Sequence, residues 1–126
     1  MSQPLPRYHD LRLEDQATVE RRFSAMDINE WCQMSGLDTV PDQVPEPLIA
    51  GLFSYLLGEE LPGHGTNYLK QHMRFEGDAR IGETLTATVT ITHLRGDKAL
   101  VNLDTLCTGE DGRMICAGDA LVLFQC

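Results

Sequence analysis

Positive charge is scarce in this sequence. Ten Lys and Arg residues stand against 19 Asp and Glu residues, which gives a net charge of −9 at pH 7. Nucleic acid is therefore not expected as a partner, because phosphate binding needs a basic surface. A ligand with its own phosphates would need local compensation. Lys70, Arg74 and Arg80 are close enough in sequence to supply it, and the alternative is that they are scattered, solvated charges.

Long apolar runs are also missing. No stretch approaches the roughly 20 residues that a membrane span needs, so no membrane association is expected. The first residues, Met-Ser-Gln-Pro-Leu-Pro-Arg, lack the apolar stretch of a secretory signal peptide. These two absences predict a cytoplasmic location.

Metal-binding spacings are absent as well. The cysteines at positions 32, 107, 116 and 126 form no Cys-x-x-Cys pair, and the histidines at 9, 64, 72 and 93 form no His-x-x-x-His pair. No Gly-rich phosphate loop follows a predicted strand. We therefore expect neither a metal nor a bound cofactor. Buried, reduced thiols are the favoured interpretation of the cysteines, with a cross-strand disulfide between Cys107 and Cys116 as the alternative.

The length of 126 residues indicates a single domain. Residues 1–15 are polar and irregular and predict a loosely held lead-in, so the domain is expected to span residues 16–126. A core of this size is modest, and pairing with a second copy would stabilise it.

Two helices are predicted in the first half of the chain. Ser24 and Asp27 are typical of a helix start, and Gly36 fits its end. Residues 37–47 hold three prolines and predict a loop. A second helix, strongly apolar, is then expected to end at Gly58. Its apolar positions have helical spacing: Leu48, Ile49, Leu52, Phe53, Leu56 and Leu57.

Strand patterns account for the remaining elements. Apolar and polar residues alternate over 17–23 and, without interruption, over 84–92. Residues 100–107 and 114–124 predict two more strands. In strand 84–92 the core face would consist of Leu85, Ala87, Val89 and Ile91.

One further strand is predicted over 68–75. Its core face would carry Leu69, Gln71, Met73 and Phe75, and its other face Tyr68, Lys70, His72 and Arg74. On this assignment His72 lies outside any pocket in the core and is a surface or subunit-contact histidine.

The turns fix which residues oppose one another. A two-residue turn at Asp111-Gly112 sets Val101 against Val122, Leu103 against Ala120 and Cys107 against Cys116, so apolar residues meet. A two-residue turn at Gly96-Asp97 would set Ile91 against Asn102, on the wrong face. We therefore predict a bulged three-residue loop, 96–98, which sets Ile91 against Leu103. The whole pattern indicates an α+β fold.

Two neighbouring segments point to a known family. The segment 47–58 and the stretch Leu61-Pro-Gly-His-Gly-Thr-Asn-Tyr-Leu-Lys-Gln71 resemble the MaoC-like (R)-specific enoyl-CoA hydratases, and the resemblance runs from about residue 23 to 124. It implies a hotdog domain, in which an antiparallel sheet wraps around a central apolar helix. It also implies a dimer with active sites at the interface.

The resemblance implies catalytic positions, but the family's Asp and His are not preserved. Its stretch Ser-Gly-Asp-x-Asn-Pro-x-His falls on Ser35-Gly-Leu-Asp-Thr-Val-Pro-Asp42. The family Asp falls on Leu37, or on Asp38 after a shift of one residue, and the family His falls on Asp42. The family His-Gly-Met falls on Ala50-Gly51-Leu52, so Gly51 would supply, at the start of the central helix, the N–H that holds a thioester carbonyl. The expected catalytic residues are Asp38, Asp42 and Gly51.

The same resemblance implies residues that bind the substrate: Leu37, Ala50, Leu52, His64, Tyr68 and Gln71. Plainer interpretations stand beside these roles. His64 is also explained as an exposed loop histidine, Gln71 as a hydrogen-bond partner of neighbouring backbone, and Asp42 and Glu46 as exposed loop carboxylates.

Three functions follow as hypotheses. The first is lyase or isomerase chemistry on an enoyl, hydroxyacyl or polyketide thioester of coenzyme A or an acyl-carrier protein, with altered acid/base residues. The second is a non-catalytic hotdog subunit or acyl-binding scaffold that pairs with an active homologue, so a heterodimer is the alternative to a homodimer. The third is a thioesterase, for which Glu46 is the nearby carboxylate. Fold resemblance does not decide among them.

Overall fold

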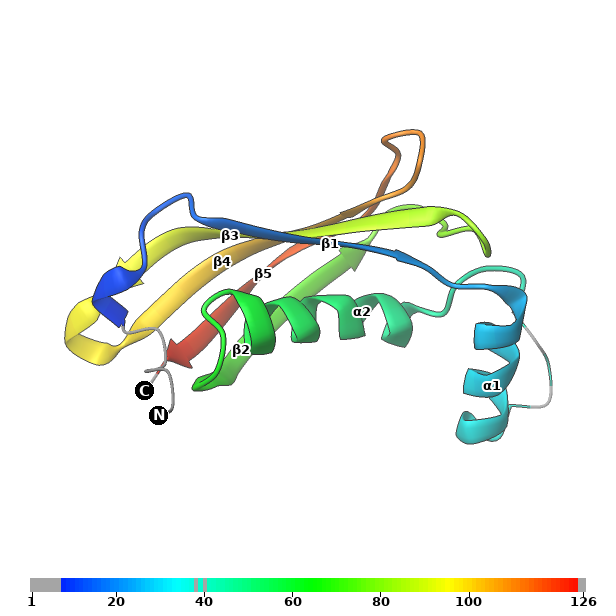
Figure 1. The fold of residues 1–126 in the computed structure, drawn as a ribbon, viewed down its shortest axis with the longest axis horizontal. Coiled ribbons are helices and arrows are strands. Elements are labelled where there is room, and N and C mark those ends of the chain that lie inside the picture. The colour runs from blue at the N-terminus through cyan, green and yellow to red at the C-terminus, as the bar shows by residue number, and fades with distance from the viewer. Residues whose placement is uncertain (1–7, 38, 40, 125–126) are drawn as a thin grey trace, which may run out of the picture.

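The protein is a curved five-stranded antiparallel sheet with one long helix along one face (Figure 1). The computed structural model describes residues 8–37, 39 and 41–124. The strand order is β1-β3-β4-β5-β2. The strands are β1 (Gln16–Arg22), β2 (Thr66–Phe75), β3 (Thr84–Arg95), β4 (Leu100–Thr108) and β5 (Met114–Phe124). This arrangement confirms the predicted α+β hotdog architecture.

The first helix, α1 (Ala25–Ser35), begins and ends where the sequence predicts. The Ser24 hydroxyl accepts a hydrogen bond from the Asp27 N–H, and the Asp27 carboxylate accepts one from the Ser24 N–H. This capping box satisfies two otherwise unpaired donors. Gly36 ends the helix in the left-handed conformation at φ 73°, which glycine adopts without a Cβ clash.

The central helix, α2 (Glu46–Tyr55), differs from the prediction at both ends. It begins within the Pro-Glu-Pro segment that was assigned to a loop, because proline is compatible with the first helical turn, where its missing N–H costs nothing. Gly58 does not end the helical path: it lies inside a π-helical turn, η2 (Leu56–Glu60). None of the helices in the described part of the chain is long and apolar enough to cross a membrane; the cytoplasmic location stays a prediction.

The core lies between α2 and the sheet. The helical side supplies Ile49, Phe53, Leu56 and Leu57, and the predicted face of β3 supplies Leu85, Ala87, Val89 and Ile91, all of which are at most 1% exposed. Burial of these side chains is the main favourable term for the fold, since removing a ring such as that of Phe53 typically costs about 3–5 kcal/mol.

Both hairpins have the predicted core register but different turns. Ile91 opposes Leu103, and Cys107 opposes Cys116, as expected. The first loop is one residue longer than predicted, because Arg95 pairs with Leu100, and a bulge at 92 restores the register. The second turn, 109–113, has five residues rather than two, because Thr108 pairs with Met114, and a bulge at 115 keeps Cys107 opposite Cys116. The buried faces therefore decide the register, and a bulge in each hairpin compensates for the longer turn.

Edge strand β2 departs from the predicted faces. The register shifts between Tyr68 and Lys70, so Tyr68 opposes the core residue Val122 and shares the helix-facing side with Gln71. Leu69, in the bulge, is 53% exposed, and Gln71 is also exposed. The predicted faces of Leu69 and Tyr68 were therefore wrong, because the bulge interrupts the alternation, whereas Gln71 lies on the predicted core-facing side and is exposed because α2 leaves this edge uncovered.

The lead-in is attached to the sheet from Tyr8 onward. The Tyr8 hydroxyl donates to the Leu100 carbonyl, and Leu11 is buried. The Glu14 N–H donates to the Ile91 carbonyl at 2.8 Å. The domain boundary at residues 15 and 16 stays a prediction.

Candidate functional site

A cavity of about 230 Å³ lies at the amino end of α2. Its first wall belongs to the segment that enters the helix: Pro41, Gln43–Glu46 and Ile49. Its second wall follows the end of β2: Phe75 and Gly77–Ala79. The two walls are joined by a hydrogen bond of 2.8 Å from the Val44 N–H to the Ala79 carbonyl and by a β-bridge between Gln43 and Arg80.

The first turn of α2, which lines this cavity, contains an available backbone donor. Pro45 and Pro47 carry no N–H, and the Leu48 N–H donates to the Pro45 carbonyl at 3.1 Å. The Glu46 N–H has no acceptor among the described residues. A donor at the positive end of a helix is suited to an oxygen that gains negative charge.

Two acidic residues line the cavity from opposite walls. Glu46 begins α2, and Asp78 lies in the loop after β2. Both residues are exposed, so their carboxylates are in contact with solvent. Glu46 also lies near the buried thiol of Cys116. Burial first, and then the carboxylates of Glu46 and Glu76, raise the pKa of this thiol to about 11.

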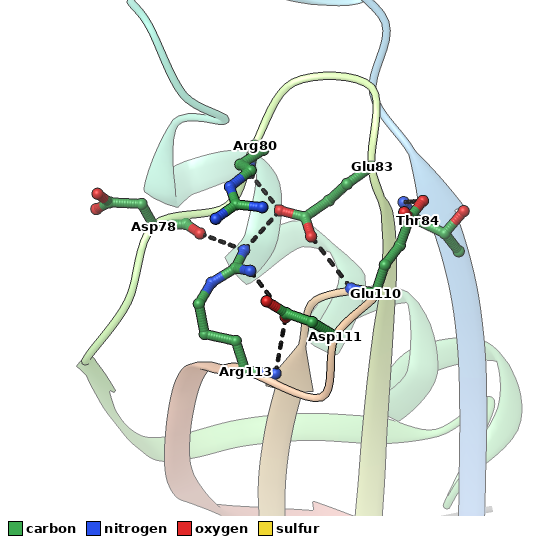
Figure 2. A network of polar contacts seen from close by, with 7 residues as sticks. All are labelled: Asp78, Arg80, Glu83, Thr84, Glu110, Asp111 and Arg113. Carbon is green, nitrogen blue, oxygen red and sulfur yellow. Dashed lines mark hydrogen bonds and ion pairs between the residues drawn. The ribbon is translucent and has the colours of Figure 1, made fainter.

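The second wall is held by a polar network behind the cavity (Figure 2). Arg113 Nη2 donates to Glu83 Oε2 at 2.7 Å and to the Asp78 carbonyl at 2.7 Å. Glu83 also accepts hydrogen bonds from the backbone N–H groups of Arg80 and Glu110. Burial by itself would raise the pKa of Glu83, but these donors together lower it below the ordinary 4.5.

Cys107 and Cys116 form a buried pair on the core face of β4 and β5. Both are free thiols with 0% exposure and oppose each other across the two strands. Burial first, and then the neighbouring Cys116, raise the pKa of Cys107 to about 12. The pair is therefore protonated at neutral pH, in line with packed, reduced thiols rather than reactive ones.

The carboxyl end of α2 carries the most family-like motif but is built differently. His64 lies in an exposed loop, with its Nε2 at 3.2 Å from Glu59 Oε2. The Tyr55 hydroxyl donates to Glu60 Oε1 at 3.3 Å. These contacts are between exposed side chains, so they contribute little to the stability of the η2 turn.

The residues predicted from the sequence are spread over the molecule. Gly51 is the sixth residue of α2, not its first, so the prediction that its N–H stands at the helix start was wrong: the helix begins five residues earlier. Ala50 and Leu52 flank it in mid-helix. Leu37 is 49% exposed in the loop after α1, and Asp38 lies outside the described residues.

Asp42, by contrast, is close to the cavity. It is exposed and stands between the lining residues Pro41 and Gln43. Tyr68 and Gln71 lie on the edge strand β2, and His72 opposes Asp119 on the face away from α2, outside the cavity as predicted. Their substrate-binding and catalytic roles stay predictions.

The predicted cationic cluster is divided. Lys70 and Arg74 point to the face of the sheet away from α2, where Arg74 Nε lies 3.9 Å from Glu76 Oε1. Arg80 instead comes directly after Ala79, the last residue of the second cavity wall. Across residues 8–37, 39 and 41–124, no three His, Cys, Asp or Glu side chains gather closely enough to hold a metal ion.

Sequence reasoning missed Asp78, Glu83 and Arg113. Glu83 precedes a strand in Ile81-Gly-Glu-Thr84, where a single carboxylate is typical of a solvated turn. A signal was nonetheless present in Gly109, since a Cβ there would stand 2.6 Å from Glu83 Oε1. That glycine leaves room for the network, but only the structure shows which atoms it admits.

Comparison with known proteins gives a consistent result. No family model matches the chain. An (R)-specific enoyl-CoA hydratase from Rhodospirillum rubrum is 34% identical over 131 residues, which cover 92% of this chain and 90% of that protein. The solved (R)-hydratase from Aeromonas caviae involved in PHA biosynthesis is 32% identical with a TM-score of 0.83, covering 91% of this chain and 98% of that one.

A second solved structure shows the same fold at lower identity. R-hydratase PhaJ1 from Pseudomonas aeruginosa superposes with a TM-score of 0.84 at 22% identity, over 95% of this chain and 85% of that one. The similarity to the R. rubrum protein extends over nearly the whole of both chains. The chain therefore belongs to the MaoC-like (R)-specific enoyl-CoA hydratase family.

Proposed function

We propose that the protein hydrates or dehydrates acyl-CoA thioesters at the cavity at the amino end of α2. The observation that carries this proposal is the combination, in one cavity, of the available Glu46 N–H and carboxylates on both walls. The relatives named (R)-specific enoyl-CoA hydratase support the substrate class. Coenzyme A is the favoured carrier, and an acyl-carrier protein is the alternative.

The chemistry assigns separate roles to backbone and side chains. The thioester oxygen gains negative charge when water attacks the β-carbon, and the Glu46 N–H donates a hydrogen bond to that oxygen. A carboxylate takes the proton from the attacking water, and a proton is delivered to the α-carbon. Dehydration reverses these steps. Glu46 and Asp78 are the candidates that line the cavity, and Asp42 and Asp38 of the neighbouring loop remain proposed contributors.

The test is the hydration of crotonyl-CoA, followed by loss of the enoyl absorbance. Glu46→Gln, Asp78→Asn, Asp42→Asn and Asp38→Asn each remove one carboxylate while keeping the backbone N–H and the side-chain size. Turnover by the wild type that is lost in one or two variants supports the proposal and names the acid/base residue. A folded wild type that turns over neither crotonyl-CoA nor the matching acyl-carrier substrate contradicts it.

Thioester hydrolysis is the second candidate, and one observation favours it. Glu46 lies in the first turn of the central helix and lines the cavity, where a carboxylate can activate water toward the thioester carbon. Release of free coenzyme A from crotonyl-CoA or butyryl-CoA, measured with a thiol reagent, separates hydrolysis from hydration in the same samples.

We further propose a homodimer formed through the edge strand β2 and the outer side of α2. Tyr55, Tyr68 and Leu69 are 48%, 43% and 53% exposed, which is unusual for large side chains beside a core. The free edge of β2 can pair with a second copy. Native mass spectrometry should show a homodimer, whereas a monomer contradicts the proposal and a fixed complex with a homologue supports the heterodimer.

A further inference from the structure

The polar network behind the cavity centres on a carboxylate that is almost removed from solvent. The Glu83 side chain is 8% exposed and the Arg113 side chain 25% exposed. Charged groups this buried are costly unless they are paired and hydrogen-bonded. Glu83 meets that condition, because one guanidinium and two backbone N–H groups donate to its two oxygens.

The sequence keeps room for this pair. A Cβ at Gly109 would stand 2.6 Å from Glu83 Oε1 and 2.9 Å from Arg113 Nη2. Any other residue at position 109 would therefore displace both members of the pair. A buried ion pair is by itself weak evidence for a contribution to stability. The pair is better explained by the backbone that it holds in place.

The pair holds the second wall of the cavity through its backbone. Arg113 Nη2 reaches past Glu83 to the Asp78 carbonyl at 2.7 Å. Two residues further along the chain, the bulged Ile115 accepts hydrogen bonds from the N–H groups of Glu76 and Gly77, at 2.9 and 3.3 Å. The β4–β5 hairpin is therefore hydrogen-bonded to three successive residues, 76–78, of the loop that forms the second wall.

A backbone hydrogen bond attaches the first wall of the cavity to the second. The Ala79 carbonyl, one residue after Asp78, accepts the Val44 N–H at 2.8 Å, two residues before α2 begins. A continuous path thus leads from Glu83 through Arg113 and the Asp78–Ala79 backbone to Val44. Along this path the residues Asp78 and Glu46 are held on facing walls of one cavity.

We propose that Glu83 is a positioning residue: through Arg113 and the Asp78 carbonyl, it fixes the separation of the two cavity walls and the alignment of their carboxylates with the substrate. This inference rests on the proposed function for its catalytic consequence. Glu83 does not touch the substrate, so its effect is on the rate of the aligned complex rather than on binding.

The decisive variant is Glu83→Gln. An amide keeps one acceptor oxygen but presents NH₂ to donors, either Arg113 and the Arg80 N–H or the Glu110 N–H. The matched control is Glu110→Gln on the same hairpin, whose Oε1 accepts from the Thr84 N–H at 2.7 Å, a contact away from the cavity walls. Arg113→Lys, which keeps the charge but loses the planar guanidinium whose Nη2 donates to both Glu83 and Asp78, is a second test if Glu83→Gln folds poorly.

Two readouts keep the inference separate from the proposed function. The first is the hydrogen exchange of the Val44 amide, which needs no substrate. The second is crotonyl-CoA hydration, in which misalignment lowers kcat by about tenfold or more while KM stays within about twofold.

Faster exchange at Val44 in Glu83→Gln and Arg113→Lys, but not in Glu110→Gln, together with the selective loss in kcat, supports the positioning role. Unchanged exchange, or equal effects in Glu110→Gln, overturns it. A rise in KM without a fall in kcat also overturns it. A wild type without turnover contradicts the proposed function instead, and the exchange comparison then decides whether Glu83 holds the walls together.

Discussion

The two ends of α2 are built in different ways. At the amino end, two loops are held together by a buried carboxylate, and carboxylates face a cavity. At the carboxyl end, the Leu61–Gln71 motif that most resembles the family follows a π-helical turn, and its histidine pairs with Glu59 in solvent. The most recognisable motif and the cavity therefore lie at opposite ends of the helix: the motif forms the turn from helix to strand, and the proposed chemistry belongs to the other end.

The largest difference between the two ends is expected in catalysis, when one side chain is substituted at each end. Glu46→Gln should lower kcat/KM for crotonyl-CoA by about 10²–10⁴-fold, the range for loss of a general acid or base. His64→Gln should leave kcat/KM within about twofold. Steady-state kinetics of both variants measure the contrast. A large loss in His64→Gln with an unaffected Glu46→Gln would reverse the assignment of the two ends.

Two glycines compare the packing of the ends. At Gly77, in the cavity wall, a Cβ would stand 2.5 Å from the Met114 carbonyl oxygen, whereas at Gly58, in the η2 turn, nothing lies within 4 Å. Gly77→Ala should therefore lower the free energy of unfolding by about 1–3 kcal/mol. Gly58→Ala should raise it by up to about 1 kcal/mol, since alanine restricts the unfolded chain.

Urea denaturation of the two alanine variants measures both effects. The packing argument fails if Gly77→Ala is as stable as the wild type, or if Gly58→Ala is the more damaging substitution.

Acid should act on the amino end through Glu83. Because the folded-state pKa of Glu83 is lowered from 4.5, its ionised form contributes stability above about pH 4.5, and that contribution is lost as the pH falls through the folded-state pKa. The wild type should therefore lose stability more steeply below about pH 4.5 than Glu83→Gln does. Denaturation midpoints from pH 7 to pH 3 test this prediction, and parallel curves for the two proteins would contradict it.

The smallest effect is expected at the carboxyl end. The side chains of His64 and Glu59 are 62% and 53% exposed, and exposed ion pairs contribute about 0–1 kcal/mol, with solvent screening keeping most near the lower limit. His64→Gln should change the free energy of unfolding by less than about 0.5 kcal/mol. A loss of more than 1 kcal/mol in urea denaturation would show that the surface pair organises η2 after all.

The sheet was largely predictable because its signal is redundant. In β3 each of Leu85, Ala87, Val89 and Ile91 is buried as the alternation predicts, and one slip of register would expose all of them. The turns carry no such redundancy. The longer turn of each hairpin is compensated by a bulge, at 92 in the first and at 115 in the second, which the pattern of apolar residues does not reveal.

The candidate site was less predictable, for two physical reasons. Pro45-Glu-Pro47 is typical of a loop as well as of a first helical turn, so the helix start was placed after residue 47, and the N–H of Gly51 rather than that of Glu46 was assigned to the site. Contacts between distant polar residues leave no periodic trace. Glu83 and Arg113 are 30 residues apart, and neither position stands out from the solvated charges around it.

The reach of Arg113 also sets an order of events during synthesis. Asp78 leaves the ribosome 35 residues before the guanidinium that holds its carbonyl, and Glu46 precedes both. The central helix and the cavity loop must therefore wait, without their anchor, until the last hairpin has closed and brought Arg113 into place. The cavity is therefore completed late, when β4 and β5 pair and bring Arg113 to the Asp78 carbonyl.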